Sequence, residues 1–181
     1  SIKIMAEIST KDQLTGLYNR RYMDGVLQRE FERAKRYHTD LCCLMLDLDH
    51  FKNVNDTYGH LCGDYVLQEF ARGLEKARRQ SDYLFRYGGE EFLIVLPETD
   101  LNGALTAMER IRSEISKRVI KSGDNEVKIT ASHGVVSFYS DTPAALVSIN
   151  DIINHADKLL YQAKQDGRNR LIGEQVNRYT T

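Results

Sequence analysis

The sequence of 181 residues has no tryptophan, two prolines and three cysteines, and neither sign of charge is in excess. Cys42, Cys43 and Cys62 are odd in number and lack zinc-site spacing, which argues against a disulfide framework and predicts a reducing compartment. No apolar run approaches the roughly 20 residues of a membrane helix, and no signal-peptide pattern opens the chain. The formal net charge of −1 offers no basic surplus for nucleic acid. We therefore expect a cytoplasmic domain that contacts neither nucleic acid nor membrane.

What the sequence does contain is a succession of apolar strands and amphipathic helices. The run Leu41–Leu46 predicts a strand buried on both faces, and two strand-like runs around Gly88-Gly89 predict a hairpin over 83–97. A second hairpin is predicted from 127–131 and 134–139. One helix is expected to end near Tyr37, and three further helices are expected over 65–77, 101–119 and 149–164. This order predicts an α/β (α+β) domain with a central, largely antiparallel sheet flanked by helices and a ferredoxin-like core.

The predicted domain covers residues 12–172, with Leu171-Ile172 as a short last strand. Residues 1–11 are interpreted as the end of a stalk helix from an upstream module, and 173–181 as a flexible tail. Because the chain begins with Ser1, we interpret it as a piece of a longer protein.

Acidic residues mark two of the predicted strand ends. Asp47 follows the buried strand, and Glu90-Glu91 follow the glycine pair, which lets a large ligand approach the backbone. If the strands are neighbours, Asp47 and Glu90 can share Mg²⁺, which prefers one or two carboxylates together with phosphate and water. Taken alone, the segment is equally compatible with a surface hairpin that carries solvated glutamates.

Two basic residues lie near the end of the last predicted helix. Lys164 and Arg168 are four residues apart, so on a helix they share one side and could hold phosphates. Their spacing is equally compatible with cations that complement the helix dipole.

Four segments in this order carry a family resemblance. They are Asp12–Arg21 (DQLTGLYNRR), Asp47–His60 with Gly63-Asp64, Gly88–Phe92 (GGEEF) and Tyr161–Asn169 (YQAKQDGRN). Together they resemble the GGDEF domain family of diguanylate cyclases over about Asp12 to Ile172. Glu90 stands where the family name has Asp, which keeps the carboxylate.

The resemblance implies a fold like that of nucleotidyl cyclase and polymerase palm domains, and a guanylyl transfer. Each of two domains in a homodimer holds one GTP. The 3′-hydroxyl of each GTP attacks the α-phosphate of the other, giving cyclic di-GMP and two pyrophosphates. The implied cofactor is Mg²⁺ or Mn²⁺, two ions per active site. The implied setting is the cytoplasmic part of a larger protein with an upstream sensory or dimerising module.

The resemblance also implies roles for single residues. The metal ligands are Asp47, the carbonyl of Leu48, and Glu90; Glu90 also activates the hydroxyl, and Glu91 supports the metal site. The implied guanine pocket consists of Asn55, His60 and Asp64. Gly88 and Gly89 let the nucleotide lie against the turn. The implied triphosphate-binding set is Phe51, Lys52, Lys164 and Arg168.

A second site is implied upstream of the glycine pair. Arg79-Gln80-Ser81-Asp82 resembles the family's RxxD inhibitory motif, and Arg110 falls where a second inhibitory arginine is often found. Arginine can stack on guanine and pair with phosphate, so this site would bind the product. The simpler interpretation is a charged helix end that leads into a strand.

Three other readings compete with an active cyclase. They are an inactive GGDEF domain that serves as a GTP or cyclic di-GMP receptor, an enzyme that makes a mixed cyclic dinucleotide, and an unrelated ferredoxin-like module. The signature acids and glycines are all present, which disfavours the receptor. His50 is interpreted as a spacer, and His38, His133 and His155 are expected to be solvated or hydrogen-bonded.

Overall fold

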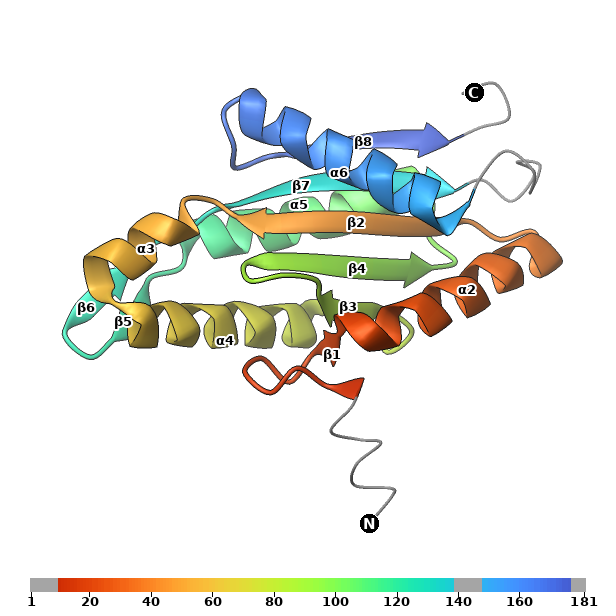
Figure 1. The fold of residues 1–181 in the computed structure, drawn as a ribbon. Helices are drawn as coiled ribbons and strands as arrows, with labels where there is room; N and C mark the ends of the chain where they lie inside the picture. The colour runs from red at the N-terminus through yellow and green to blue at the C-terminus, as the bar shows by residue number, and fades with distance from the viewer. Residues whose placement is uncertain (1–9, 139–147, 177–181) are drawn as a thin grey trace, which may run out of the picture.

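The computed structural model describes residues 10–138 and 148–176, and its centre is a six-stranded sheet with helices on both faces (Figure 1). The strands of this sheet are β1 (Tyr18–Asn19), β2 (Leu41–Leu48), β3 (Tyr83–Arg86), β4 (Glu91–Pro97), β7 (Ala131–Phe138) and β8 (Leu171–Val176). The helices are α2 (Arg20–Tyr37), α3 (Phe51–Tyr58), α4 (His60–Ala77), α5 (Leu101–Lys117) and α6 (Ile149–Gln165). Strands β5 (Ile120–Ser122) and β6 (Asn125–Val127) form a separate two-stranded sheet.

The strand order of the main sheet is β1-β3-β4-β2-β7-β8. The central strand β2 pairs antiparallel with β4 and β7, and β3 pairs antiparallel with β4. The order β3-β4-β2-β7, with helices in the two crossovers, is that of a ferredoxin-like unit. The predicted fold class is therefore confirmed. The two outer pairs, β1 with β3 and β7 with β8, are parallel.

Two hydrophobic clusters explain why the apolar run of β2 is uninterrupted. Alternate residues such as Cys42 and Leu44 face the cluster under α4 and α5, whereas Cys43 and Met45 face the cluster under α2 and α6. Side chains of a strand point to opposite faces in turn, so the part of a strand that hydrophobic clusters cover on both faces is expected to be apolar at every position, as Leu41–Leu46 is. Every residue of β2 is buried.

The predicted helices ending near Tyr37 and over 101–119 and 149–164 are confirmed to within two residues. The connection expected before residue 65 is instead helical, because α3 covers Phe51–Tyr58 and α4 begins at His60. Its helical signal is short: Phe51 and Val54 are the two buried positions of α3. Gly59, with φ of 88°, separates the two helices.

The second predicted hairpin is wrong. The turn at Gly123, where φ is 58°, joins β5 to β6, and β7 is a single strand between β2 and β8. Residues 134–138 pair with the distant strands β2 and β8, and such tertiary pairing is not visible in local alternation, whereas residue 139 lies outside the described residues.

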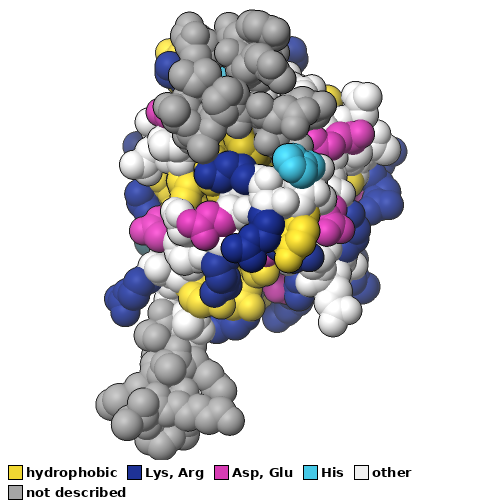
Figure 2. All heavy atoms as spheres, turned by 90° about the vertical axis from the view of Figure 1, so that its right-hand side faces the viewer, with side chains coloured by type: hydrophobic (Ala, Val, Ile, Leu, Met, Phe, Trp, Pro, Cys, Tyr) yellow, Lys and Arg dark blue, Asp and Glu magenta, His cyan; other side chains and the backbone are white. Residues whose placement is uncertain are grey.

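The last strand is longer than expected. β8 runs to Val176, so residues 173–176 of the predicted tail pair with β7. Residues 177–181 of that tail, and 1–9 of the predicted stalk helix, lie outside the described residues. Of the described helices, none has the length and apolar character of a membrane span. On the face seen in Figure 2, basic and acidic side chains are interspersed, as expected from the net charge of −1.

Close packing of α6 on β7 generates a stability prediction. A Cβ at Gly134 would lie 2.1 Å from the Ala156 carbonyl oxygen and 2.4 Å from the Leu160 amide nitrogen. We expect Gly134→Ala to lower the free energy of unfolding by about 2–3 kcal/mol, because helix backbone must move. Unfolding in urea measures this change in the free energy of unfolding. Gly25→Ala is the matched control: no atom lies within 4 Å of a Cβ there, and this helical substitution should stabilise by about 0.5–1 kcal/mol. Equal effects of the two changes would contradict the packing argument.

Candidate functional site

The acidic residues converge where β2 ends, near the start of α3 (Figure 1). In the antiparallel register, Asp47 lies opposite Glu91, so their side chains share one face of the sheet. The Leu48 amide donates to the Glu90 carbonyl oxygen at 3.2 Å, which holds the turn before β4 against the end of β2. Asp47, Glu90 and Glu91 therefore belong to one site.

Asp47 is buried, and only one of its two carboxylate oxygens accepts a hydrogen bond from a described residue. Its Oδ2 accepts from Nζ of Lys164 on α6, whereas its buried Oδ1 has no hydrogen-bond partner among the residues that the structure describes. Burial raises the pKa of Asp47, as do the nearby Glu90 and Asp49, whereas Lys164 lowers it. A buried carboxylate oxygen without a donor is costly, so this atom is suited to a ligand from outside the chain.

The site also holds more negative charge than its own cations balance. Burial raises the pKa of Glu91, and the charge of Asp47 raises it further. Among residues 10–138 and 148–176, no group of three or more His, Cys, Asp or Glu side chains forms a ready metal site. A hard cation here would thus depend on one or two carboxylates, a carbonyl, and water or phosphate, which is the way Mg²⁺ is commonly held. The residues fit such an ion.

The turn between β3 and β4 differs from the predicted one. A glycine pair favours a hairpin because both residues can take positive φ, but here neither Gly88 nor Gly89 does so. A Cβ at Gly88 would meet only ordinary contacts, the nearest at 3.6 Å, and at Gly89 it would meet nothing within 4 Å. The chain's own packing therefore does not require these glycines, and the space beside them is open to a ligand.

A partly buried ion pair between Arg86 and Asp12 holds this turn in place. The Arg86 guanidinium donates to the carbonyl oxygens of Gly88 at 3.2 Å and Gly89 at 2.9 Å, and it pairs with Asp12 at 3.2 Å. Asp12 in turn accepts from the Thr15 amide at 2.9 Å. Asp12 lies in the first of the four family segments and Arg86 in the predicted hairpin, and neither residue had a predicted role.

Asp49 is a second residue without a predicted role. It is buried, and its carboxylate accepts from the hydroxyls of Thr130 and Ser132, each at 2.6 Å, and from the Asn169 amide at 3.0 Å. It thereby joins the end of β2 to β7 and to the loop after α6. Its position two residues after Asp47, inside the same motif, was the available signal.

Lys164 and Arg168 do not share a helix face. The helix ends at Gln165, and the chain closes with the Arg168 amide donating to Ala163 and the Gly167 amide to Lys164, as in a Schellman motif. Arg168 therefore lies on the exposed loop, with φ of 62°. The predicted end of this helix is confirmed, but the inference that Lys164 and Arg168 share one side of it is wrong, because the chain leaves the helix before Arg168.

The predicted guanine pocket lies at the corner between α3 and α4. A Cβ at Gly63 would lie 1.8 Å from Asn55 Oδ1, so the glycine makes room for this half-buried amide. His60 and Asp64 are exposed on the first turns of α4, beside Gly63. Phe51, which is buried, and Lys52, which is exposed, begin α3 next to the acidic site. The structure thus joins these residues into one continuous region.

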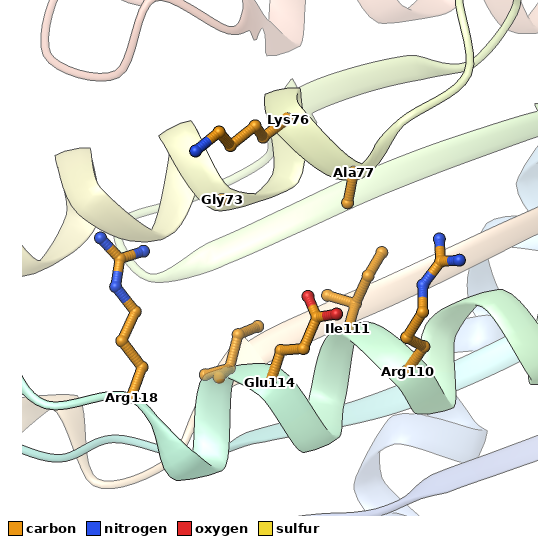
Figure 3. Close-up of a pocket in the computed structure, with 8 residues that line it drawn as sticks. Gly73, Lys76, Ala77, Arg110, Ile111, Glu114 and Arg118 are labelled. Carbon is orange, nitrogen blue, oxygen red and sulfur yellow. The ribbon is translucent and has the colours of Figure 1, made fainter.

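The residues of the predicted inhibitory site meet elsewhere. Arg79, Asp82 and Arg110 line one cavity of about 350 Å³ between α4, α5 and the sheet. Arg79 Nη2 pairs with Asp82 Oδ1 at 2.9 Å. Arg110 also borders a neighbouring groove of about 450 Å³, whose other charged residues are Lys76, Glu114 and Arg118 (Figure 3).

Comparison with known proteins gives the family. The model of the GGDEF domain, described as diguanylate cyclase, matches residues 9–170. The chain belongs to the GGDEF family.

Relatives and solved structures agree with this assignment. The chain is 42% identical over 172 residues to the response regulator PleD of Caulobacter vibrioides, covering 93% of this chain and 37% of PleD. It resembles the coiled coil and GGDEF domain of DgcB from Caulobacter crescentus in complex with c-di-GMP, with a TM-score of 0.87, 32% identity, and coverage of 96% and 90%. It also resembles the active GGEEF domain of a diguanylate cyclase from Vibrio cholerae, with a TM-score of 0.77, 34% identity, and coverage of 86% and 96%.

The histidines of this GGDEF domain differ in environment. His155 Nε2 lies 3.1 Å from Glu174, so its expected hydrogen bond is confirmed. His133 is fully buried and neither ring nitrogen has a partner, so the expectation was wrong for this residue. Burial lowers the pKa of His133 to about 3, which keeps the ring neutral. It faces the core beneath α5, on a strand that local alternation had assigned to a hairpin.

The charge repulsion at Glu91 predicts a pH dependence of stability. Because its pKa is raised on folding, the folded state holds this proton more tightly than the unfolded state, and ionisation costs stability. The cost is absent below the ordinary value of 4.5 and is complete above the folded pKa. Without divalent cations, Glu91→Gln should therefore be more stable than the parent chain at pH 7 and equal to it at pH 3. Urea unfolding at both pH values measures this. Glu126→Gln, on the exposed strand β6, is the control, and a less stable Glu91→Gln at pH 7 would contradict the repulsion.

Proposed function

We propose that this GGDEF domain is a diguanylate cyclase that condenses two GTP into cyclic di-GMP and two pyrophosphates. The observation that carries the proposal is the buried, unpartnered Oδ1 of Asp47, next to Glu90, Glu91 and Lys164 in a chain with the complete family signature. Each 3′-hydroxyl attacks the α-phosphate of the other GTP, its proton passes to Glu90, and the bond to the β-phosphate breaks to release pyrophosphate.

Asp47, the Leu48 carbonyl and Glu90 are the groups that would hold Mg²⁺ or Mn²⁺, with two ions per site. The ions would stabilise charge on the transferring phosphoryl group and lower the pKa of the attacking hydroxyl. The unpartnered Oδ1 and the raised pKa of Glu91 support this assignment, because both are relieved by positive charge.

Basic and backbone groups around the acids are suited to the triphosphate. Lys164 already pairs with the carboxylate of Asp47, and Arg168 is exposed on the loop that follows α6. We assign both to phosphate binding. Phe51 and Lys52 begin α3, so their amides precede the helix's own hydrogen bonds and can donate to phosphate.

Recognition of guanine is assigned to the corner of α3 and α4. The Asp64 carboxylate can accept from guanine N1–H and N2–H₂, a pair that adenine does not offer. Asn55, held against Gly63, and His60 complete the pocket. This arrangement supports GTP as the substrate over ATP.

One domain supplies one nucleotide site, so the reaction requires a second copy of this chain with its own GTP. The cavity of Arg79, Asp82 and Arg110 is proposed to bind cyclic di-GMP and to inhibit the enzyme. The chain spans 37% of the length of PleD.

Turnover of GTP tests the proposed chemistry. The chain fused to a parallel coiled coil should form cyclic di-GMP from GTP and Mg²⁺, and Glu90→Gln should lower the rate about a thousandfold or more, because it removes a metal ligand and the base. Chromatography of the products measures both. Glu126→Gln, at an exposed site on the separate β5–β6 sheet, should keep the parent rate. Full activity of Glu90→Gln would refute the metal assignment, and nucleotide binding without turnover by the fused parent chain would favour a receptor.

Product inhibition has its own test. Arg79→Ala should raise the concentration of cyclic di-GMP that halves the initial rate at least about tenfold, because a charged partner for guanine and phosphate is lost. Arg72→Ala, an exposed arginine of α4 that does not line the cavity, is the control. Unchanged inhibition in Arg79→Ala would rule out this cavity as the product site.

A further inference from the structure

The acid of the proposed product site is already occupied by its own arginine. Asp82 is 5% exposed. Its carboxylate accepts from the Arg79 amide and from Nη2, both at 2.9 Å, and from Nε at 3.3 Å. An incoming guanine edge therefore cannot reach the carboxylate until the Arg79 guanidinium turns away.

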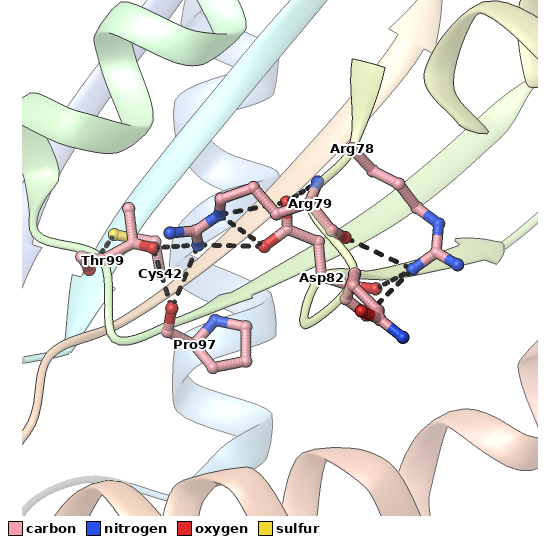
Figure 4. Close-up of polar contacts among 7 residues, drawn as sticks. Cys42, Arg78, Arg79, Asp82, Pro97 and Thr99 are labelled. Carbon is pink, nitrogen blue, oxygen red and sulfur yellow. Dashed lines mark hydrogen bonds and ion pairs between the residues drawn. The ribbon is translucent and has the colours of Figure 1, made fainter. Parts of the chain in front are cut away.

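A threonine outside the motif holds that guanidinium in place. Nη2 of Arg79 donates to Thr99 Oγ1 at 2.5 Å and to the Pro97 carbonyl oxygen at 3.1 Å (Figure 4). The Thr99 hydroxyl itself donates to the same carbonyl at 2.8 Å. The guanidinium thus links the turn after α4 to the loop after β4.

The threonine is a fixed acceptor because the central strand holds its backbone. Buried Cys42, on β2, donates from Sγ to the Thr99 carbonyl oxygen at 3.1 Å, and the Thr99 amide donates to Asp40 at 3.4 Å. The turn on the other side is also braced: Arg78 Nη1 donates to the Asp82 carbonyl oxygen at 2.7 Å. Both ends of the Arg79 contact are therefore rigid.

We propose that Thr99 is a positioning residue that keeps the product site closed by holding Arg79 over Asp82. Cyclic di-GMP must break the contact between Arg79 and Thr99 before Asp82 can accept from guanine. The inference rests on the proposed function in taking cyclic di-GMP as the ligand. It adds a residue outside the RxxD motif that sets how much product is needed.

The proposal predicts that loss of the Thr99 hydroxyl strengthens the binding of cyclic di-GMP. In the closed state the Thr99 hydroxyl accepts a hydrogen bond from a charged donor, and product binding loses that bond. Thr99→Val keeps the shape of the side chain but removes the acceptor, so the site should open at lower cost. Because Arg79 is half exposed, we take the low end of the free energy that a hydrogen bond to a charged group contributes. This corresponds to about tenfold tighter binding of cyclic di-GMP by Thr99→Val.

Calorimetric titration of cyclic di-GMP into the chain, without GTP, tests this. The parent chain, Thr99→Val and Thr99→Ser are compared. Thr99→Ser keeps the hydroxyl and should bind like the parent, whereas Thr99→Val should bind about tenfold more tightly. Equal affinity of all three, or weaker binding by Thr99→Val alone, would overturn the proposal. Loss of binding in both variants would also overturn it, since the serine hydroxyl would then fail to replace that of threonine.

A second measurement separates this proposal from the product site itself. The Nε–H signal of Arg79 in a ¹H–¹⁵N spectrum, assigned by its loss in Arg79→Lys, should exchange with water faster in Thr99→Val than in the parent or Thr99→Ser. Unchanged exchange would refute the role of Thr99 even if cyclic di-GMP binds. If neither parent nor variants bind cyclic di-GMP, the product site is refuted and the inference falls with it.

Discussion

The pairing of β2 with β4 is the constraint on which the rest of this structure depends. Their antiparallel register sets Asp47 opposite Glu91 and draws the Glu90 carbonyl oxygen onto the Leu48 amide. A slip by one residue would turn the whole strand over, because side chains alternate between faces. Both faces of β2 are covered, so the two hydrophobic clusters specify this register at every position of the strand. The packing of the core therefore fixes the positions of the acidic residues relative to one another.

The core also explains how so much negative charge can be held in one place. Asp47 is surrounded by the buried end of the sheet, and its neighbours Glu90, Glu91 and Asp49 are acids as well. Lys164 balances part of this charge, and two hydroxyls and a backbone amide donate hydrogen bonds to the oxygens of Asp49. What remains is the unpartnered oxygen of Asp47. Among the described residues this oxygen lacks a positively charged or hydrogen-bonding partner, and the metal ion of the proposed site would supply one.

The strand β4 connects the two proposed sites. It begins at Glu91, beside the acids, and ends at Pro97, whose carbonyl oxygen accepts from Arg79. Thr99, two residues further on, is held by Cys42 at the other end of β2 from Asp47. The same two strands thus carry the proposed catalytic groups at one end and contacts of the proposed product site at the other. The arrangement is compact enough for one rigid element to contact both.

The sequence by itself determined the class of fold, the family and the chemical types present, because these depend on local periodicity and on motifs that are contiguous in the chain. The buried run of β2, the helices up to Tyr37 and over 101–119 and 149–164, and the acids at residues 47, 90 and 91 were all readable in this way. It could not determine that 134–138 joins the central sheet or that residues 51–58 are helical, since each depends on packing.

Only the tertiary structure decided the partners of the polar groups. Burial and long-range contacts made Lys164 the partner of Asp47, Thr99 the partner of Arg79, Asp49 a structural anchor, and His133 a neutral core residue. Hydrogen bonds between residues 20 to 120 positions apart leave no periodic trace in a sequence.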